Sequence, residues 1–299
     1  MKKLLFIPLD YQYKPYQEFY ASFCKKFDTL YFTDKESAIK FNPDYIYCHS
    51  SAISLADMQE IKEKTNAFVI QWTGNVRSDV LPEVMEYKTV CDLTLLASGI
   101  GQKEMYESKL GHPVKYFQHH VSNWQHIPAQ ELNSGKIIFI GNAYNQFEGA
   151  VERGDLCALL TSEFQQFEVW GNGFNLPQFR NPSNIPFDKT QPMYNSAYIS
   201  ISANCFNDIE GYYSDRPLHI MVAGGCCLMR YVPSLENFFT DMEHCVFYKS
   251  NEEAVEKINF LIANPELRNK IARQGQEHVM KYHSNDYRVI ELINYLGLI

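Results

Sequence analysis

Residues Ser214–Val232 read SDRPLHIMVAGGCCLMRYV. This segment predicts a helix that runs into a Gly-Gly break and then into a short buried strand. Arg216 stands in the first turn of the helix, and His219 follows one turn later on nearly the same face. Gly224 and Gly225 end the helix without a Cβ penalty and let another chain or a ligand come close. A helix followed by a buried strand is the repeating element of an α/β fold.

Outward from this segment, short apolar runs alternate with helix-like segments along the whole chain. Continuous apolar strands that alternate with helices indicate parallel sheets covered on both faces. We expect strands at Lys3–Pro8, Thr29–Thr33, Tyr45–His49, Phe68–Trp72, Leu93–Ala97, Val114–Phe117, Lys136–Gly141, Glu168–Gly171, Tyr198–Ala203, Cys226–Arg230 and Val246–Tyr248.

The alternation is interrupted once, by the polar segment His120–Gly135, which contains a proline and has no clear periodicity. It restarts at Lys136 with KIIFIG. We therefore predict an α/β protein with two Rossmann-like domains, 1–130 and 131–299, that face each other across a cleft. Ligands of open α/β sheets bind at the carboxyl ends of the strands. Whether the last helix crosses back to the first domain is left open.

The composition is that of an ordinary globular protein. The chain has 299 residues and a net charge of −8, without the basic excess of a nucleic-acid binder. Its eight cysteines form no CxxC pair and no metal-like spacing with histidine, so we expect free buried thiols and a cytoplasmic location. The start MKKLLFIPLDYQ reads as a first strand and not as a signal peptide, and no apolar run is long enough to span a bilayer.

Together, several stretches give the chain a resemblance to the glycosyltransferases of the GT-B fold. More narrowly, the chain is similar to the CgeB-like members, relatives of the large group 1 family. The order and spacing of these stretches carry the resemblance: KIIFIGNAYN (136–145), FEVWGNGF (167–174), IPFDKTQPMYNSAYISISANC (185–205), SDRPLHIMVAGGCCLMRYVPSLENFF (214–239) and the closing helices from Tyr248 to Ser284.

The resemblance implies that the second domain holds a sugar linked to a nucleoside diphosphate. It places Gly141 and Asn142 in the loop nearest the diphosphate and Tyr194 on a short helix beside it. Arg216 would pair with phosphate, which suits a planar and permanently charged guanidinium. The carboxylate that commonly binds the ribose hydroxyls falls at His219, where this chain departs from the family pattern.

Each donor-side residue also has a purely structural interpretation. Arg216 could form a helix-start salt bridge, and His219 could be a half-buried core histidine. Gly224 and Gly225 could be a plain helix C-cap, a role compatible with ligand approach. Tyr213 could shield the diphosphate or simply pack. The Gly141 loop carries no full GxGxxG or Walker signature, so classical dinucleotide or ATP binding has little support.

In the first domain, Asp10 follows the first strand, and His49 ends the third. Both lie at the predicted carboxyl edge and are our candidates for the general base that an inverting transferase needs. Trp72 and Asn75 after the fourth strand, and His120 before the linker, are candidates for the acceptor side. A strand-end cap, a turn or a core position would explain these residues equally well.

We therefore expect a metal-independent glycosyltransferase that moves a sugar from a nucleotide sugar to an acceptor hydroxyl. No Asp-x-Asp motif occurs, and no metal ligand set or other cofactor is expected. The acceptor is left open between a glycan, a small molecule and a modified nucleic-acid base. The alternatives are a sugar-nucleotide epimerase or phosphorylase on the same fold, or a non-catalytic nucleotide-sugar-binding module.

Overall fold

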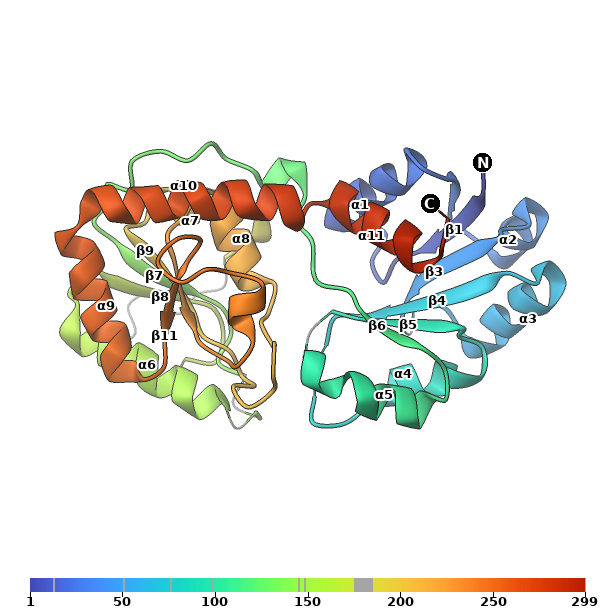
Figure 1. Ribbon diagram of the computed structural model, residues 1–299, viewed down its shortest axis with the longest axis horizontal. Helices are drawn as coiled ribbons and strands as arrows, with labels where there is room; N and C mark the ends of the chain where they lie inside the picture. The colour runs from blue at the N-terminus through green and yellow to red at the C-terminus, as the bar shows by residue number, and fades with distance from the viewer. Residues whose placement is uncertain are drawn as a thin grey trace. The chain divides into compact units, whose positions relative to one another are not determined.

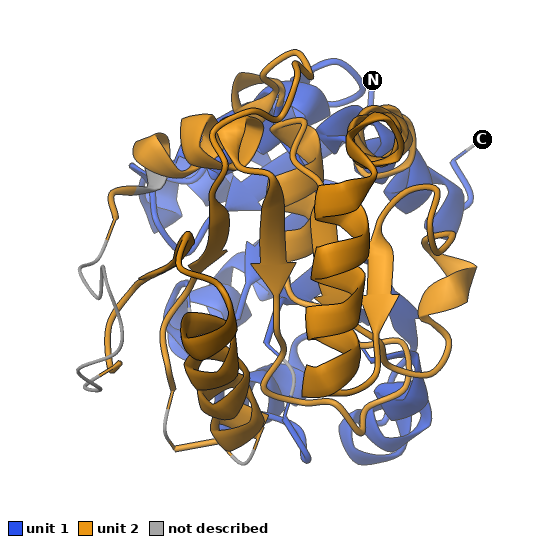
Figure 2. Ribbon diagram, turned by 90° about the vertical axis from the view of Figure 1, so that its left-hand side faces the viewer, with its two compact units in different colours: residues 1–122, 284–299 blue, residues 123–283 orange. Residues whose placement is uncertain are grey.

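The computed structural model describes residues 1–12, 14–50, 52–75, 77–97, 99–144, 146–147, 149–174 and 185–298. The chain divides into two compact units, coloured separately in Figure 2. Unit 1 comprises Met1–Ser122 together with Ser284–Ile299, and unit 2 comprises Asn123–His283. The chain thus leaves unit 1 after Ser122, within the polar segment that follows His120, and the last helix belongs to unit 1.

Unit 1 is built on a six-stranded parallel sheet in the order β2-β1-β3-β4-β5-β6. Its strands are β1 (Lys3–Ile7), β2 (Asp28–Tyr31), β3 (Tyr45–His49), β4 (Phe68–Thr73), β5 (Leu93–Leu96) and β6 (Val114–Tyr116). Its helices are α1 (Lys14–Cys24), α2 (Lys35–Phe41), α3 (Leu55–Thr65), α4 (Pro82–Glu86), α5 (Lys103–Leu110) and α11 (Asn285–Tyr295).

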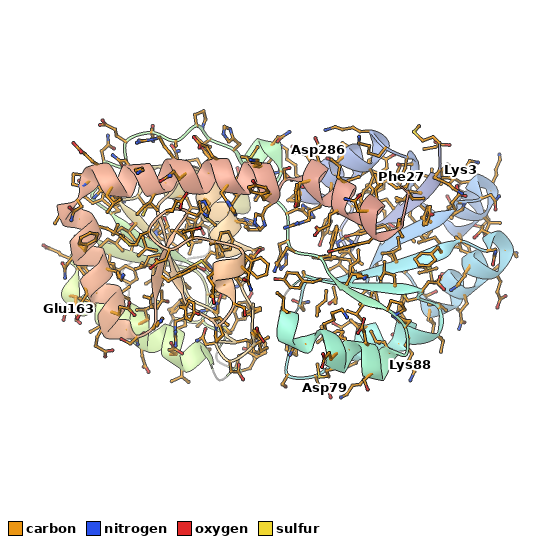
Figure 3. The ribbon with its side chains drawn as sticks, in the orientation of Figure 1. Lys3, Phe27, Asp79, Lys88, Glu163 and Asp286 are labelled. Carbon is orange, nitrogen blue, oxygen red and sulfur yellow. The ribbon has the colours of Figure 1, made fainter. Side chains whose placement is uncertain are left out.

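The apolar strands of unit 1 are buried on both faces because successive side chains point to opposite sides. Leu4 and Phe6 of β1 pack toward α1 and α11, whereas Leu5 and Ile7 pack toward α2 and α3. At the start of α11, Asp286, which Figure 3 labels, accepts from Nζ of Lys25 at 2.7 Å, so an exposed ion pair joins the end of α1 to the start of α11.

Unit 2 is built on a five-stranded parallel sheet in the order β11-β10-β9-β7-β8. Its strands are β7 (Ile137–Ile140), β8 (Phe167–Trp170), β9 (Ile199–Ser202), β10 (Cys227–Arg230) and β11 (Val246–Tyr248). Its helices are α6 (Gly149–Glu163), α7 (Phe187–Ser196), α8 (Arg216–Val222), α9 (Asn251–Ala263) and α10 (Pro265–Tyr282), labelled in Figure 1.

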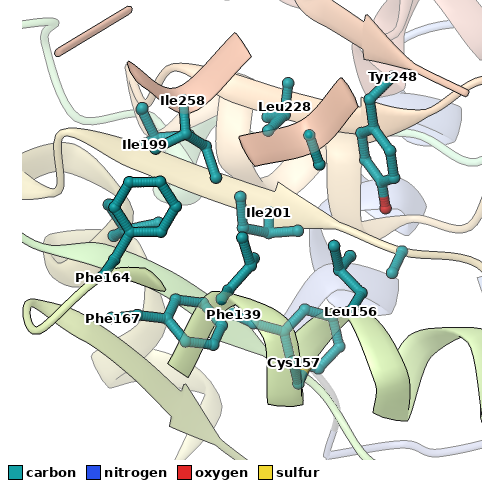
Figure 4. Close-up of a cluster of buried hydrophobic side chains, with 14 of the residues drawn as sticks. Phe139, Leu156, Cys157, Phe164, Phe167, Ile199, Ile201, Leu228, Tyr248 and Ile258 are labelled. Atoms are coloured by element: carbon teal, nitrogen blue, oxygen red, sulfur yellow. The ribbon is translucent and has the colours of Figure 1, made fainter. Parts of the chain in front are cut away.

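One core of unit 2 lies between the sheet and the helices α6 and α9. Figure 4 shows Phe139, Ile201 and Leu228 of three adjacent strands packed against Leu156 of α6 and Ile258 of α9. The α/β class and the two parallel sheets predicted from the sequence are confirmed, and every predicted strand is present within two residues of its expected bounds. Helix α2 was not predicted.

In each sheet, the second strand of the chain lies on one side of the first strand, and the later strands lie on its other side. The strand order therefore reverses at one point. In unit 1 the reversal falls between β1 and β3, and in unit 2 it falls between β7 and β9. Connections that diverge on the two faces leave a crevice at the carboxyl ends of such strands, where ligands of this fold class bind.

The helix α6 allows a first prediction about stability. Gly154 lies inside α6, and a Cβ built there meets no atom within 4 Å. Alanine restricts the unfolded chain without a clash in the helix, so Gly154→Ala should stabilise the protein by about 0.5–1 kcal/mol. Thermal or urea unfolding measures this; a variant less stable than the wild type would contradict the prediction.

Candidate functional site

A pocket of about 290 Å³ opens at the carboxyl ends of β7 and β8, beside the reversal point of the unit 2 sheet. Five residues selected from the sequence line it together: Gly141, Asn142, Tyr194, Arg216 and His219. Sequence reasoning missed the other lining residues, which are Ile140, Tyr144, Trp170, Gly171, Ile185, Thr190 and Asp215. We call this cavity the β7 pocket.

The guanidinium of Arg216 is fixed at the end of two strands by main-chain acceptors. Its Nε donates to the carbonyl oxygen of Ile140 at 2.8 Å, and Nη1 donates to that of Ala203 at 3.0 Å. The guanidinium carbon lies 5.1 Å from the centre of the Phe139 ring. Arg216 therefore bridges the carboxyl ends of β7 and β9 on the wall of the β7 pocket.

A second arginine, Arg153 of α6, binds the same strand ends. Its two terminal nitrogens donate to the carbonyl oxygens of Asn142 and Ala203, each at 2.7 Å. Burial, with a smaller contribution from the charge of Arg216, lowers the pKa of Arg153 to about 10. Among the described residues, no carboxylate forms an ion pair with either guanidinium. Two positive charges therefore share the oxygen of Ala203, and within the described residues neither is ion-paired to a carboxylate.

Sequence reasoning missed Arg153, although the sequence contains a signal for it. Ala150, Cys157 and Leu160 are buried on one stripe of α6, and Arg153 occupies the same stripe at 4% exposure. A charged residue on the apolar face of a helix must find polar partners in the interior. Its position three residues after Ala150 therefore marks it as a buried functional or structural arginine.

The helix expected between Ser214 and the Gly-Gly break is present and short. Helix α8 begins at Arg216 and has seven residues, and the side chain of Asp215 at its N-cap makes no capping hydrogen bond. The first residue of α8 is therefore the one that carries the guanidinium on the pocket wall.

His219 and Asp215 form a small polar group on the pocket wall. Nε2 of His219 lies 3.6 Å from Oδ2 of Asp215, and Nδ1 lies 3.3 Å from Nε2 of Gln125. Burial lowers the pKa of His219 below its ordinary value, which favours the neutral imidazole at neutral pH. The pocket thus contains a carboxylate one residue before Arg216 even though the expected acidic position is a histidine.

The tight turn after β7 depends on two glycines. A Cβ on Gly141 would lie 2.5 Å from Nη2 of Arg216, and a Cβ on Gly171 would overlap the carbonyl oxygen of Gly141. Oδ1 of Asn142 accepts from the amide of Asn172 at 2.9 Å and joins the turns that follow β7 and β8. The missing side chains at Gly141 and Gly171 therefore let the guanidinium and the two turns come close.

Three residues predicted on the donor side do not line the pocket. Tyr213 is fully buried, with its ring centre 5.2 Å from that of Phe239. Gly224 has a φ of +76°, and a Cβ there would lie 2.8 Å from the backbone of Ala129. A Cβ on Gly225 would lie 2.7 Å from the carbonyl oxygen of Tyr194. The glycines therefore serve the end of α8 and its packing, and Tyr213 is a core residue.

In unit 1, Asp10 and His49 follow and end the two strands that flank the reversal point. Asp10 is exposed and accepts from the amide of Gln12 at 2.8 Å. His49 is 4% exposed, and its ring centre lies 4.4 Å from that of Tyr16. The structure therefore distinguishes an accessible carboxylate from an imidazole enclosed by aromatic rings, and their catalytic roles stay predictions.

The three residues expected on the acceptor side have different environments. Trp72 is 9% exposed, and its Nε1 donates to the carbonyl oxygen of Phe117 at 3.4 Å, so it is mainly a core residue. Asn75 is exposed. The ring of His120 is stacked on Phe19 with 4.0 Å between centres, and burial lowers the pKa of His120 to about 3.

The burial of His49 predicts a pH dependence of stability. Burial lowers the pKa of His49 from 6.5 to about 4. Between these two pH values the unfolded chain binds a proton at His49 that the folded chain does not. The contribution of neutral His49 to the free energy of unfolding is therefore complete above pH 6.5 and declines as the pH falls toward 4. One such proton changes the free energy of unfolding by about 1.4 kcal/mol per pH unit. His49→Phe removes the group that binds it, so the free energy of unfolding should fall less steeply as the pH is lowered. Calorimetric melting between pH 7 and 4.5 measures the slope.

His126 offers a control because its side chain is exposed. His126→Phe should leave the slope of the wild type in place, and the residual slope of His49→Phe should reflect the other buried histidines, such as His278 with its pKa of about 4. Equal slopes for His49→Phe and the wild type would remove His49 as a source of the acid sensitivity.

Within the described ranges, His, Cys, Asp and Glu side chains nowhere gather in threes as a metal ion would need. Among the helices that the structure describes, none combines the length and apolar composition needed to cross a bilayer.

Comparison with known proteins gives a consistent result. Residues 152–294 match the model of a family described as glycosyl transferase-like. HepE of Anabaena, solved with UDP-glucose, is 10% identical, with a TM-score of 0.69 and full coverage of both chains. Sucrose-phosphate synthase of Thermosynechococcus elongatus is 10% identical, with a TM-score of 0.67 over 100% of this chain and 99% of that one.

A glycosyltransferase of Rickettsia africae is 11% identical, with a TM-score of 0.67 over 98% of this chain and 97% of that one. No curated protein matches the chain. The two-sheet fold expected from the resemblance is confirmed, whereas the narrower CgeB-like assignment stays a prediction.

Proposed function

We propose that this chain, a glycosyltransferase with the GT-B fold, transfers a sugar from a nucleoside-diphosphate sugar to an acceptor hydroxyl, with the diphosphate bound beside Arg216 in the β7 pocket. The observation that carries the proposal is the pair of guanidinium groups, Arg216 and Arg153, held by main-chain oxygens at the reversal point of the sheet.

Physical chemistry favours an anion at this place. Two like charges that share the oxygen of Ala203 repel each other, and burial makes the charged form of Arg153 costly. A bound diphosphate would offset both effects and accept charge-assisted hydrogen bonds from Arg216. The same charge would stabilise the diphosphate as it leaves the sugar, when its negative charge develops.

Asp215 and His219 support a role in holding the nucleoside. Both line the β7 pocket, and a carboxylate or a neutral imidazole can accept a hydrogen bond from a hydroxyl. We propose that Asp215 supplies the ribose contact that the family pattern would place at the position of His219. Asp215 directly precedes Arg216, so the proposed contacts with the ribose and with the diphosphate lie in the same pocket.

The proposed reaction needs no metal ion, because Arg216 and Arg153 provide positive charge where the diphosphate would leave.

For the general base we retain Asp10 and His49, both on unit 1. Asp10 has the accessible carboxylate, whereas the lowered pKa of His49 makes its imidazole a weak base. Loss of turnover in Asp10→Asn, with nucleotide binding unchanged, would select Asp10.

The experiment that tests the proposal has two arms. Thermal shift with UDP, GDP, TDP and CMP should reveal at least one stabilising nucleotide, because a ligand of the folded state raises the melting temperature. Incubation with the matching radiolabelled nucleotide sugars and candidate acceptors should then yield a labelled glycoside and release the nucleotide.

The outcomes separate the alternatives. Conversion of the labelled nucleotide sugar without an acceptor would indicate an epimerase. Release of a sugar 1-phosphate from a glycan, when inorganic phosphate replaces the nucleotide sugar, would indicate a phosphorylase. Stabilisation without turnover would indicate a binding module. If none of the nucleotides shifts the melting temperature, the proposal fails.

A further inference from the structure

A second cavity of about 360 Å³ lies in unit 2 and shares no lining residue with the β7 pocket. It opens at the carboxyl ends of β10 and β11, beside the first turn of α9. Figure 1 labels β11 and α9. We call it the β11 cavity and define it by its aromatic residues Tyr231, Phe239 and Phe247 and its carboxylates Glu236, Asp241 and Glu253.

From this cavity we propose a second binding site, for a neutral carbohydrate ring. The proposal goes beyond the donor site of the β7 pocket. A pyranose presents an apolar C–H face on one side and hydroxyl donors around its edge. The β11 cavity offers aromatic surface and carboxylate acceptors in one space, and its volume lies within the range of small-ligand sites.

The aromatic wall is formed by neighbouring rings at the ends of two strands. Tyr231 follows β10 and Phe247 belongs to β11, with 5.5 Å between ring centres and a tilt of 60°. Aromatic faces carry negative charge density that attracts the slightly positive C–H groups of a sugar. Because both rings are positioned by the strand ends, the wall is formed before a ligand arrives.

The carboxylates are fixed by the protein and retain capacity to accept more hydrogen bonds. Glu236 accepts from the hydroxyl of Tyr231 at 3.1 Å, Asp241 accepts from the amide of Phe247 at 2.8 Å, and Glu253 accepts from the amide of Lys249 at 2.7 Å. An ionised carboxylate has about four acceptor sites and no donor, so the ligand must bring donors. Hydroxyl groups meet this requirement.

Lys249 argues against a cationic ligand. Its Nζ lies 4.8 Å from the centre of the Tyr231 ring, so the chain already provides a positive charge beside the carboxylates of the cavity. A metal ion is disfavoured as well, because no metal-binding group of three side chains is found among the described residues. A neutral polyol therefore fits the cavity better than an amine or a metal.

The test measures sugar binding by saturation-transfer NMR, which detects weak ligands. The probes are glucose, N-acetylglucosamine and maltose, with ethanolamine as the cationic comparison. Tyr231→Ala should weaken the binding of at least one sugar by roughly tenfold, as expected when an aromatic stacking face is lost. Tyr231→Phe keeps the ring and should retain most of the binding.

Controls separate this site from the donor site. Phe260→Ala removes an exposed ring of α9 outside the cavity and should bind sugars as the wild type does. Arg216→Met should also retain sugar binding, because it alters only the β7 pocket. Equal binding by Tyr231→Ala and the wild type, no binding of any sugar to the wild type, or binding of ethanolamine alone would overturn the proposal.

Discussion

Arg216→Met should lower kcat/KM for sugar transfer by about 10²–10³-fold, the loss expected when one group that stabilises developing negative charge is removed. Methionine keeps an apolar stem above Phe139 but cannot donate to Ile140 or Ala203. It also leaves the diphosphate without its nearest guanidinium. Initial rates with the nucleotide sugar that the thermal-shift arm identifies would measure the effect, together with the dissociation constant of the nucleotide.

Two further variants serve as a control and as an intermediate case. Arg273→Met removes an exposed arginine of α10 and should leave kcat/KM unchanged. Arg216→Lys keeps one positive charge but loses the planar fork that reaches two carbonyl oxygens, so its activity should lie between those of Arg216→Met and the wild type. A wild-type kcat/KM in Arg216→Met would remove Arg216 from the mechanism.

The strands could be predicted from the sequence because they are continuous apolar runs. KIIFIG contains β7, and YIYCH forms β3. Such runs are typical of parallel strands that helices cover on both faces, so the pattern indicates both the strands and their neighbours. Helix α2 was not predicted because only Ala38 of its seven residues is buried, which leaves almost no apolar stripe.

Two residues of the β7 pocket, Gly141 and Arg216, could also be predicted. Gly141 and Arg216 stand next to the ends of predicted elements, and the topology brings those ends together. What the sequence could not provide was the direction of side chains outside regular patterns. Tyr213 directly precedes Ser214, and the sequence left open whether its ring shields the diphosphate or packs; the ring lies in the core beside Phe239.

Arg153 shows the opposite limit. Arg153 lies inside a helix, whereas most of the expected site residues lie in loops and at the ends of elements. The guanidinium reaches the pocket turn from inside α6 because a long side chain extends from the buried stripe to the carbonyl oxygens of Asn142 and Ala203. That reach depends on how α6 packs on the sheet, which no local pattern specifies.

The second large effect is expected at Gly171, where the turns after β7 and β8 meet. Gly171→Ala should destabilise the protein by about 3 kcal/mol or more and abolish nucleotide binding. Its φ of +146° is unfavourable for alanine, and the added methyl group would overlap the carbonyl oxygen of Gly141. Relief of that overlap must separate the two turns, which moves Gly141 away from Arg216.

Gly154→Ala adds the same methyl group within the same unit, at a place where nothing lies within 4 Å. A difference between Gly171→Ala and Gly154→Ala therefore reflects the surroundings of the methyl group and not the substitution itself. We expect the two variants to shift the melting temperature in opposite directions, with nucleotide binding kept only by Gly154→Ala. Gly173→Ala adds a milder case, because its φ is +85° and the new Cβ would lie 3.1 Å from that of Ala143. If Gly171→Ala melts and binds nucleotide as the wild type does, the close approach of these turns does not shape the pocket.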